Sequence, residues 1–107
     1  MRRQVVWSKD ARSDYLEILR YIAEDNPDAA DRVADRFDQA AAALSDFATG
    51  RVGRVTGTYE KVLPGLPYIL AYEIIGTDQG VEIVGILRII HGARDWPAGS
   101  WPRVDTE

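Results

Sequence analysis

Apolar residues in the first half of the chain recur every three or four positions, in two consecutive segments. The apolar positions are Ala11, Tyr15, Ile18 and Ile22 in the first segment and Ala30, Val33, Phe37, Ala40, Leu44 and Phe47 in the second. This spacing places each set on one face of a helix, so we expect amphipathic helices over about residues 9–24 and 27–50. Ser8 and Asn26 directly precede them and are the expected N-caps. Because only a short connection joins them, we expect the two helices to pack as an antiparallel hairpin.

The second half changes to runs rich in β-branched and aromatic residues, separated by glycine and proline. These runs predict strands at residues 58–63, 68–75 and 81–91, and residues 3–7 predict one more at the N-terminus. We therefore expect a two-layer α+β fold (β-α-α-β-β-β), with the helical hairpin packed on a mostly antiparallel sheet. The 107 residues suit a single domain, in which residues 96–107 would form a C-terminal tail.

The last predicted strand is apolar on both of its faces. One alternate set, which we expect to face the helices, is Val81, Ile83, Leu87 and Ile89; the other is Glu82, Val84, Ile86, Arg88 and Ile90. In a two-layer fold the second set lies on the uncovered face of the sheet, where an apolar row of this size indicates an interaction surface. We expect the C-terminal tail, a second copy or a partner protein to cover it. The expected contact residues are Val84, Ile86, Arg88 and Ile90.

The charge of the chain limits its classes of partner. The net charge is −4, and acidic residues outnumber basic ones in both halves, by ten to seven in residues 1–50 and by seven to six in residues 51–107. Tight binding to nucleic acid through phosphate neutralisation requires an excess of positive charge. We therefore do not expect the chain alone to bind RNA or DNA tightly.

Other classes of site are disfavoured by composition. The chain has no cysteine and one histidine, so we expect no disulfide, no metal site and no cofactor. It has no phosphate-binding glycine loop and no serine in a nucleophile-elbow sequence. No apolar run approaches the roughly 20 residues of a membrane helix, and we expect a cytoplasmic protein that does not bind membranes.

Basic and titratable side chains are expected near the ends of adjacent strands, with aromatic residues beside them. The first group is Arg54, Lys61, Arg88, His91 and Arg94, and the aromatic group is Tyr59, Tyr68, Tyr72 and Trp96. Such a set suits RNA cleavage, because cations stabilise the charge on a pentavalent phosphate while His or Tyr moves protons. The alternative is structural. The tyrosines would then pack in the sheet, the arginines would form ion pairs, His91 would serve as a hydrogen-bonding residue and Trp96 would close the end of the core.

Three stretches of the second half resemble the RelE/ParE superfamily of toxins. They are residues 57–62 (GTYEKV), 64–72 (PGLPYILAY) and 86–97 (ILRIIHGARDWP), and the last is closest to ParE-type members that end in His-Gly-Ala-Arg-Asp-Trp-Pro. The resemblance implies the β-α-α-β-β-β fold and the role of toxin in a type II toxin–antitoxin pair, held inactive by a cognate protein antitoxin. That antitoxin would be the partner that covers the outward set on the last strand.

The resemblance leaves three functions open. RelE-type members cut mRNA on the ribosome, and in that case the catalytic set would be Arg54, Arg88, His91 and Arg94. ParE-type members instead poison DNA gyrase without cutting RNA, and the residues that contact the target would be His91, Arg94 and Trp96. The third function is that of a toxin-fold protein that has lost toxicity and only binds its partner.

The start of the penultimate predicted strand bears on the choice between the first two functions. Nuclease-type relatives generally carry an Arg at its start, whereas this chain has Tyr68 and Ile69 there. The resemblance therefore favours a gyrase-directed toxin over a ribosome-dependent endonuclease.

Overall fold

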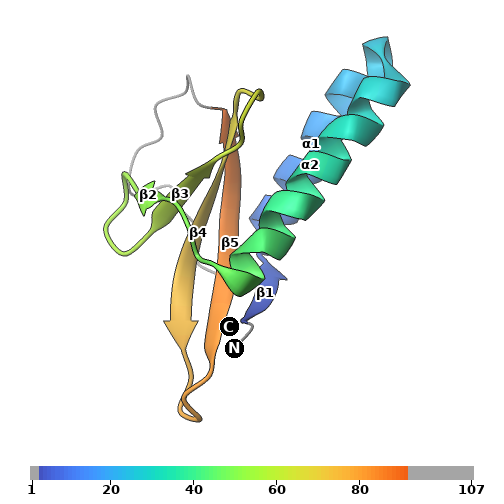
Figure 1. The fold of residues 1–107 in the computed structure, drawn as a ribbon. Helices are drawn as coiled ribbons and strands as arrows, with labels where there is room; N and C mark the ends of the chain where they lie inside the picture. Colours follow the sequence, from blue (N-terminus) through green and yellow to red (C-terminus); the bar gives the residue numbers. More distant parts are fainter. Residues whose placement is uncertain (1–2, 92–107) are drawn as a thin grey trace.

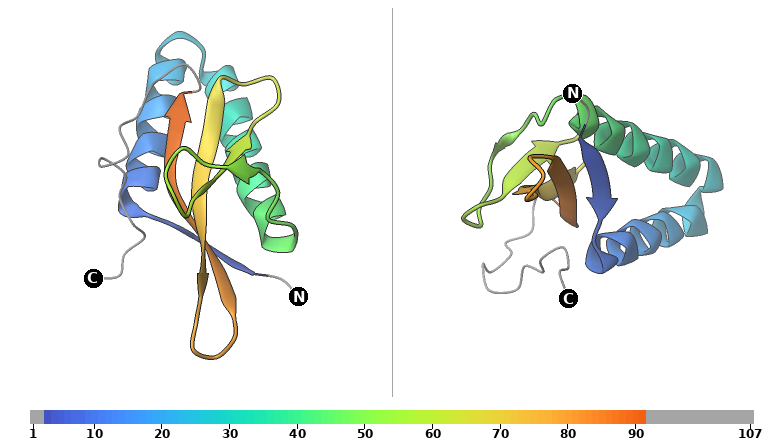
Figure 2. Two further views of the ribbon diagram at one scale, coloured as in Figure 1. Left: turned by 90° about the vertical axis from the view of Figure 1, so that its left-hand side faces the viewer. Right: turned by 90° about the horizontal axis from the view of Figure 1, so that it is seen from below.

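Two helices pack against one face of a five-stranded sheet, which confirms the predicted α+β architecture (Figure 1). The computed structural model describes residues 3–91 of the chain. Its elements, in chain order, are β1 (Gln4–Trp7), α1 (Lys9–Asp25), α2 (Pro27–Asp46), β2 (Arg51–Val52), β3 (Tyr59–Val62), β4 (Tyr68–Gly76) and β5 (Glu82–His91). The helices form the expected antiparallel hairpin, which lies to one side of the strands (Figure 2).

The sheet is built around β5, which lies between β1 and β4. The strand order is β1-β5-β4-β3-β2; β1 runs parallel to β5, and the other neighbours are antiparallel. Strand β2 is the one element that the sequence pattern did not predict. It comprises Arg51, paired with Glu60, and Val52, paired with Tyr59, and two residues are too few to show a strand period.

The first residues of both helices follow the expected capping pattern. The Ser8 hydroxyl accepts a hydrogen bond from the backbone N–H of Ala11 and donates one to the carbonyl of Leu87, each at 2.9 Å. Asn26 caps α2 by accepting the N–H of Ala29 at 3.0 Å. Ser8 therefore both starts α1 and joins that start to β5.

The C-terminal end of α2 differs from the prediction. The helix ends at Asp46, four residues before Gly50, and Phe47 is 73% exposed instead of continuing the apolar face. Gly50 has another role: it adopts φ +143°, and a Cβ there would lie 2.7 Å from the Glu60 carbonyl oxygen. The residue allows the chain to pass close over β3, which no side chain would permit.

A chain of aromatic rings runs from β1 through the helices to the end of β5. Trp7 packs edge-on against Tyr15 at 5.6 Å between ring centroids, Tyr15 lies 5.6 Å from Phe37, and Phe37 lies 5.7 Å from Tyr68. Tyr68 in turn packs edge-on against His91 at 5.7 Å. Contacts of this kind favour fixed ring orientations, so the core positions the side chains at the strand end.

A β-bulge interrupts the pairing of β4 with β5. Ala71 is paired with Arg88, but the next residue, Tyr72, is paired with Ile86, so Leu87 is an extra residue on β5. An extra residue changes which alternate positions face a given side of the sheet. The simple alternation assumed from sequence therefore cannot hold along the whole strand.

The bulge overturns part of the predicted orientation of β5. Val84 and Ile86 are fully buried in the helix-facing core, among residues such as Phe37 and Leu44, so the prediction that they face away from the helices is wrong. Ile89 belongs to the same core, as predicted. The helix-facing positions are thus even-numbered before the bulge and odd-numbered after it.

An ion pair joins α1 to the part of β5 that β1 does not reach. Strand β1 pairs with β5 only as far as Ile86. Beyond it, the Asp14 carboxylate accepts hydrogen bonds from Nε and a terminal nitrogen of Arg88 at 2.8 and 2.9 Å, and from the backbone N–H of Ile89 at 3.0 Å. The hydrogen bond from Arg88 to Asp14 raises the Arg88 pKa above its ordinary value, against the opposing effect of burial.

A second ion-pair cluster holds the segment between β2 and β3 against the sheet. The side chain of Glu60 is only 3% exposed, and it accepts hydrogen bonds from the backbone and Nε of Arg54 at 2.9 and 2.8 Å and from Arg51 at 3.2 Å. Burial by itself raises the Glu60 pKa, but the hydrogen bonds from Arg54 and Arg51 outweigh it and lower that pKa.

Removing the Asp14 carboxylate should destabilise the fold. Asp14→Ala leaves a partly buried guanidinium and the Ile89 N–H without their acceptor, so we expect the free energy of unfolding to fall by about 2–4 kcal/mol. Urea denaturation measures the loss, with Glu24→Ala on the exposed end of the same helix as control, expected to change stability by about 0.5 kcal/mol or less. Equal losses in the two variants would contradict the assigned role of Asp14.

Glu60 should make stability depend on acid pH. Its folded pKa is lowered below the unfolded value of about 4.3, so its contribution is complete above that pH and is lost as pH falls through the folded pKa. We expect Glu60→Gln to lower stability by about 1–3 kcal/mol at pH 7, and this difference from the wild type should shrink progressively as the pH falls below about 4. Unfolding free energies between pH 3 and 7 test this, with Glu24→Gln as control. A Glu60→Gln curve parallel to the wild-type curve would show that the carboxylate does not titrate with folding.

Candidate functional site

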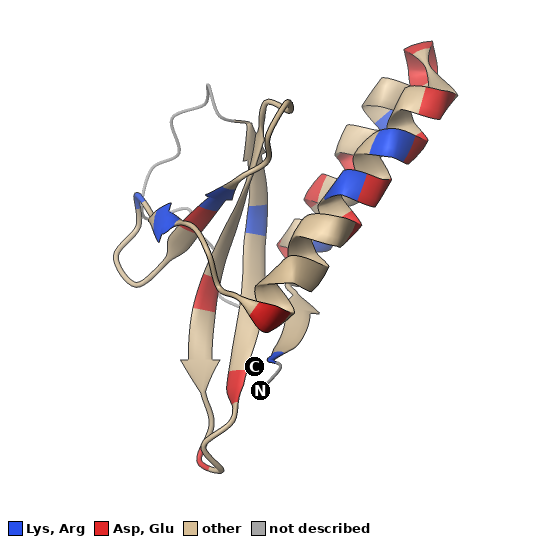
Figure 3. Ribbon diagram, viewed as in Figure 1, with Lys and Arg blue, Asp and Glu red and all other residues tan. Residues whose placement is uncertain are grey.

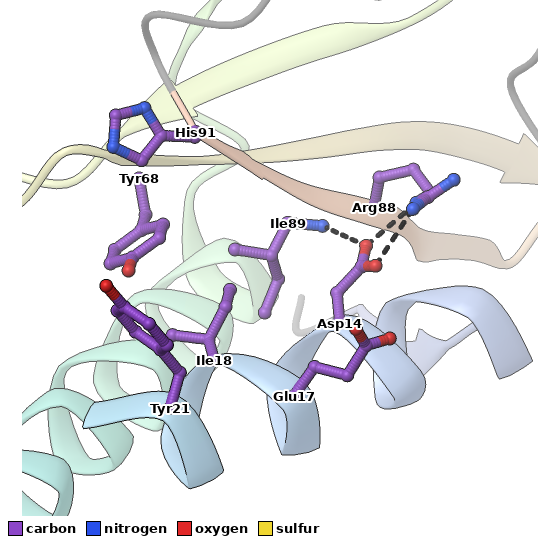
Figure 4. A pocket seen from close by; sticks show the side chains of 8 residues that line it. All are labelled: Asp14, Glu17, Ile18, Tyr21, Tyr68, Arg88, Ile89 and His91. Atoms are coloured by element: carbon purple, nitrogen blue, oxygen red, sulfur yellow. Dashed lines mark hydrogen bonds and ion pairs between the residues drawn. The ribbon is translucent and has the colours of Figure 1, made fainter. Parts of the chain in front are cut away.

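A groove lies between α1 and the end of β5, close to the only histidine. Its volume is about 540 Å³. Within residues 3–91 the residues that line it are Asp14, Glu17, Ile18, Tyr21, Tyr68, Arg88, Ile89 and His91 (Figure 4). We call this feature the α1–β5 groove. It brings polar side chains from a helix and two strands to one surface.

The two ends of the α1–β5 groove differ in chemistry. The Arg88–Asp14 ion pair lies at one end. At the other end the hydroxyl groups of Tyr21 and Tyr68 point toward each other, and His91 lies next to Tyr68 (Figure 4). Burial, and secondarily the nearby Tyr21, raises the pKa of Tyr68. Tyr68 therefore stays protonated at neutral pH and acts as a hydrogen-bonding group.

The structure divides the group of cations that the sequence suggested as one site. Arg88 and His91 both line the α1–β5 groove. Arg54 is bound to Glu60, and the amino group of Lys61 donates to the Thr49 hydroxyl at 2.9 Å, both in the β2–β3 part of the molecule. The remaining cation, Arg94, lies outside the described residues, as does Trp96 of the aromatic group.

Two of the suggested aromatic residues have a packing role. The rings of Tyr59 and Tyr72 stack at 5.6 Å, and the Tyr72 hydroxyl donates to the backbone carbonyl of Thr49 at 2.7 Å. Burial raises the Tyr72 pKa, and Tyr59 adds to the shift. These contacts match the structural alternative for this pair, whereas Tyr68 is the tyrosine that reaches the groove.

The suggested partner-contact residues on β5 also separate. Val84 and Ile86 are core residues, as described above, and present no surface to a partner in this conformation. Ile90 pairs with Ile69 on the other face of the sheet and is likewise fully buried. Of the four, Arg88 alone lines the groove.

The helical side of the groove was not identified from the sequence. Asp14, Glu17 and Tyr21 face it from α1, and together with Asp10 they recur at spacings of four, three and four residues. That spacing places polar residues along one helical face, which is a usable signal. The apolar positions of this helix alone gave no prediction for these four residues.

The electrostatics of the groove do not favour a phosphate. The Asp14 carboxylate engages Arg88 through two nitrogens, and the carboxylates of Asp10 and Glu17 also act on the same guanidinium. An incoming anion would compete with Asp14 and meet the charge of Glu17. Acidic and basic residues are interspersed along both helices (Figure 3). Neither helix in residues 3–91 is long and apolar enough to cross a membrane. The same residues contain no group of three side chains able to hold a metal ion.

Comparison with known proteins identifies relatives over almost the whole chain. The chain is 40% identical over 97 residues to a Sinorhizobium fredii protein named "Putative toxin Y4kP", covering 90% of this chain and 95% of that protein. It is 36% identical over 92 residues to "Toxin RelE2" of Caulobacter vibrioides, covering 85% of this chain and 97% of the relative.

A solved structure and a family description agree with these relatives. The fold is similar to a chain of the chromosomal ParDE toxin–antitoxin system from P. aeruginosa, with a TM-score of 0.72, 22% identity and coverage of 83% of this chain and 95% of that one. Residues 5–96 match the family described as the ParE toxin of the type II toxin–antitoxin system parDE. The chain therefore belongs to the ParE toxin family, within the RelE/ParE superfamily that its last strand resembles.

Proposed function

We propose that this chain inhibits growth by poisoning DNA gyrase in the cytoplasm and that a cognate protein antitoxin neutralises it. The observation that carries the choice of gyrase is the environment of Arg88. It is the one Lys or Arg in β4 and β5, and its guanidinium is bound by Asp14 beside the charge of Glu17. A site built to stabilise a phosphate transition state needs cations directed at the phosphate, not held by carboxylates.

The proposed target contact lies where β5 ends. His91 is exposed there and packs against Tyr68, whose ring is held by the aromatic chain of the core. Arg94 and Trp96 follow within five residues, and we propose that they complete the contact with His91. Aromatic and arginine side chains are the types most often found at energetically dominant interface positions.

The proposed antitoxin surface is revised from the one suggested by sequence. Since Val84 and Ile86 belong to the core, we propose that the antitoxin contacts Arg88 and the α1–β5 groove beside it. Val84 and Ile86 would then contribute indirectly, because their packing in the core holds β5 in place.

A second candidate function is that of a ribosome-dependent mRNA endonuclease. Two observations favour it: one relative is named Toxin RelE2, and His91 and Arg88 line the same groove. In that case the proton-transfer residue would be His91, with Arg88 and Arg94 near the phosphate. A third candidate is a non-toxic protein that only binds its antitoxin.

The purified chain should inhibit DNA supercoiling by gyrase and leave mRNA intact in a translating extract. Supercoiling assays and primer extension of mRNA, run with equal amounts of toxin, measure both activities. Preincubation with the protein encoded beside this chain should remove the gyrase effect. Codon-phased mRNA cuts that His91→Ala abolishes, with gyrase unaffected, would reverse the assignment. Loss of both effects would indicate the non-toxic function.

Substitutions at the proposed target contact should reduce toxicity more than stability. We expect Arg94→Ala and Trp96→Ala each to raise the toxin concentration for half-inhibition by about tenfold, which is the cost of an interface residue worth about 1.4 kcal/mol. Melting curves provide the control, with Lys61→Ala as a matched surface substitution. A collapsed melting temperature for Trp96→Ala would instead identify Trp96 as a core residue, whose loss costs about 3–5 kcal/mol.

A further inference from the structure

The α1–β5 groove has the shape and chemistry of a receptor for one long side chain. Ile18 and Ile89 form its apolar floor, between the Arg88–Asp14 pair at one end and the tyrosines at the other (Figure 4). A floor of this kind suits methylene groups, and the polar end suits a terminal charge. Lys and Arg combine both, since they lay an apolar stem on apolar surface and keep the charged head hydrated.

The charge around the groove selects a cation as that head. Within residues 3–91, Asp10, Asp14 and Glu17 contribute three carboxylates along one face of α1, and Arg88 contributes the one guanidinium that lines the groove. Asp14 is already engaged by Arg88 and by the Ile89 N–H. In residues 3–91 no hydrogen bond or ion pair engages the Glu17 carboxylate. A cation at this position gains a partner without breaking an existing pair.

The tyrosines add a second reason for a cation. Tyr21 is 73% exposed, and with Tyr68 it presents aromatic ring surface at the end of the groove (Figure 4). A guanidinium or ammonium against a tyrosine ring is attracted by the ring's quadrupole. The exposed ring of Tyr21 and the half-buried ring of Tyr68, beside the Glu17 carboxylate, form a recognisable cation-binding arrangement, whereas RNA or DNA phosphates would be repelled.

We propose that the α1–β5 groove binds an arginine or lysine side chain of the antitoxin, with its stem on Ile18 and Ile89 and its charge between Glu17 and the tyrosines. The proposal rests on the proposed function for the identity of the partner. It adds the chemistry of recognition: the toxin is the acidic member of this contact, and the antitoxin segment is basic. Charge complementarity of this type also speeds association and selects the cognate partner.

The chemistry of the groove can be tested without the antitoxin. The probe is the blocked tripeptide acetyl-Leu-Arg-Leu-amide, titrated into the ¹⁵N-labelled full chain, with the same peptide carrying citrulline in place of arginine as the uncharged control. We expect saturable shifts at Tyr21, Tyr68 and Glu17 with a Kd on the order of millimolar for the arginine peptide only. Raising the salt concentration should weaken the binding.

Variants on α1 provide the matched comparison. Glu17→Gln and Tyr21→Leu should each weaken arginine-peptide binding by about two- to five-fold, as expected for one exposed ion pair or cation–π contact. Glu24→Gln, on the same helix but away from the groove lining, should leave it unchanged. Equal binding of the citrulline peptide, or no effect of Glu17→Gln, would overturn the proposal. A shift of the groove resonances in the double variant Arg94→Gln/Arg103→Gln, relative to the wild type and without peptide, would also overturn the proposal. An arginine of the chain itself would then occupy the groove.

The antitoxin measurement separates this inference from the proposed function. Affinity of the neighbouring-frame protein for the wild-type chain tests whether an antitoxin binds at all. If it binds, the same two variants should weaken it by a similar factor while Glu24→Gln does not. If the antitoxin binds the Glu17→Gln and Tyr21→Leu variants as tightly as the wild type, the groove is not its binding site, although the antitoxin is still the partner. If the groove binds the arginine peptide but the neighbouring-frame protein does not bind the chain, the antitoxin is rejected as the partner and the chemistry of the groove stands.

Discussion

The arrangement around β5 depends on the hydrogen bonds that the Asp14 carboxylate accepts from this strand. Strand β1 covers the edge of β5 only as far as Ile86, and an edge strand beyond that point would expose unpaired backbone groups. Asp14 accepts the Ile89 N–H and two hydrogen bonds from Arg88, while Ser8 binds the Leu87 carbonyl. Side chains at the start of α1 thereby satisfy backbone groups of β5 that a neighbouring strand would otherwise bind. The polar face of α1 lies against this edge of the sheet.

Two of the cations that sequence alone would assign to phosphate chemistry are held within the fold. Arg54 binds the buried Glu60, which Arg51 also contacts, and Arg88 is bound by Asp14, so these two candidate side chains stabilise a loop and a sheet edge. The surface that remains beside His91 is aromatic and acidic. Such a surface suits recognition of a protein segment better than attack on RNA, and it agrees with the family to which the chain belongs.

Most of the fold could be predicted because its signals are local. The helical period, the Ser8 and Asn26 caps and the strand runs each depend on neighbouring residues, and each was found where expected. The failures have equally definite causes. Strand β2 is too short to show a period. Gly50 serves a close approach to β3 instead of ending α2, which stops at Asp46, and one extra residue at Leu87 reverses the faces of β5.

The sequence by itself determined the α+β class, the order of elements and the family resemblance of residues 86–97, since these follow from local pattern and residue identity. Only the tertiary structure decided which cations share a site. Arg54 and Arg88 come to lie in separate ion pairs, and Asp14, Glu17 and Tyr21 line one groove with His91, which is seventy or more positions away in the chain. Long-range pairing of charges depends on strand order, register and a bulge, and no local pattern encodes these together.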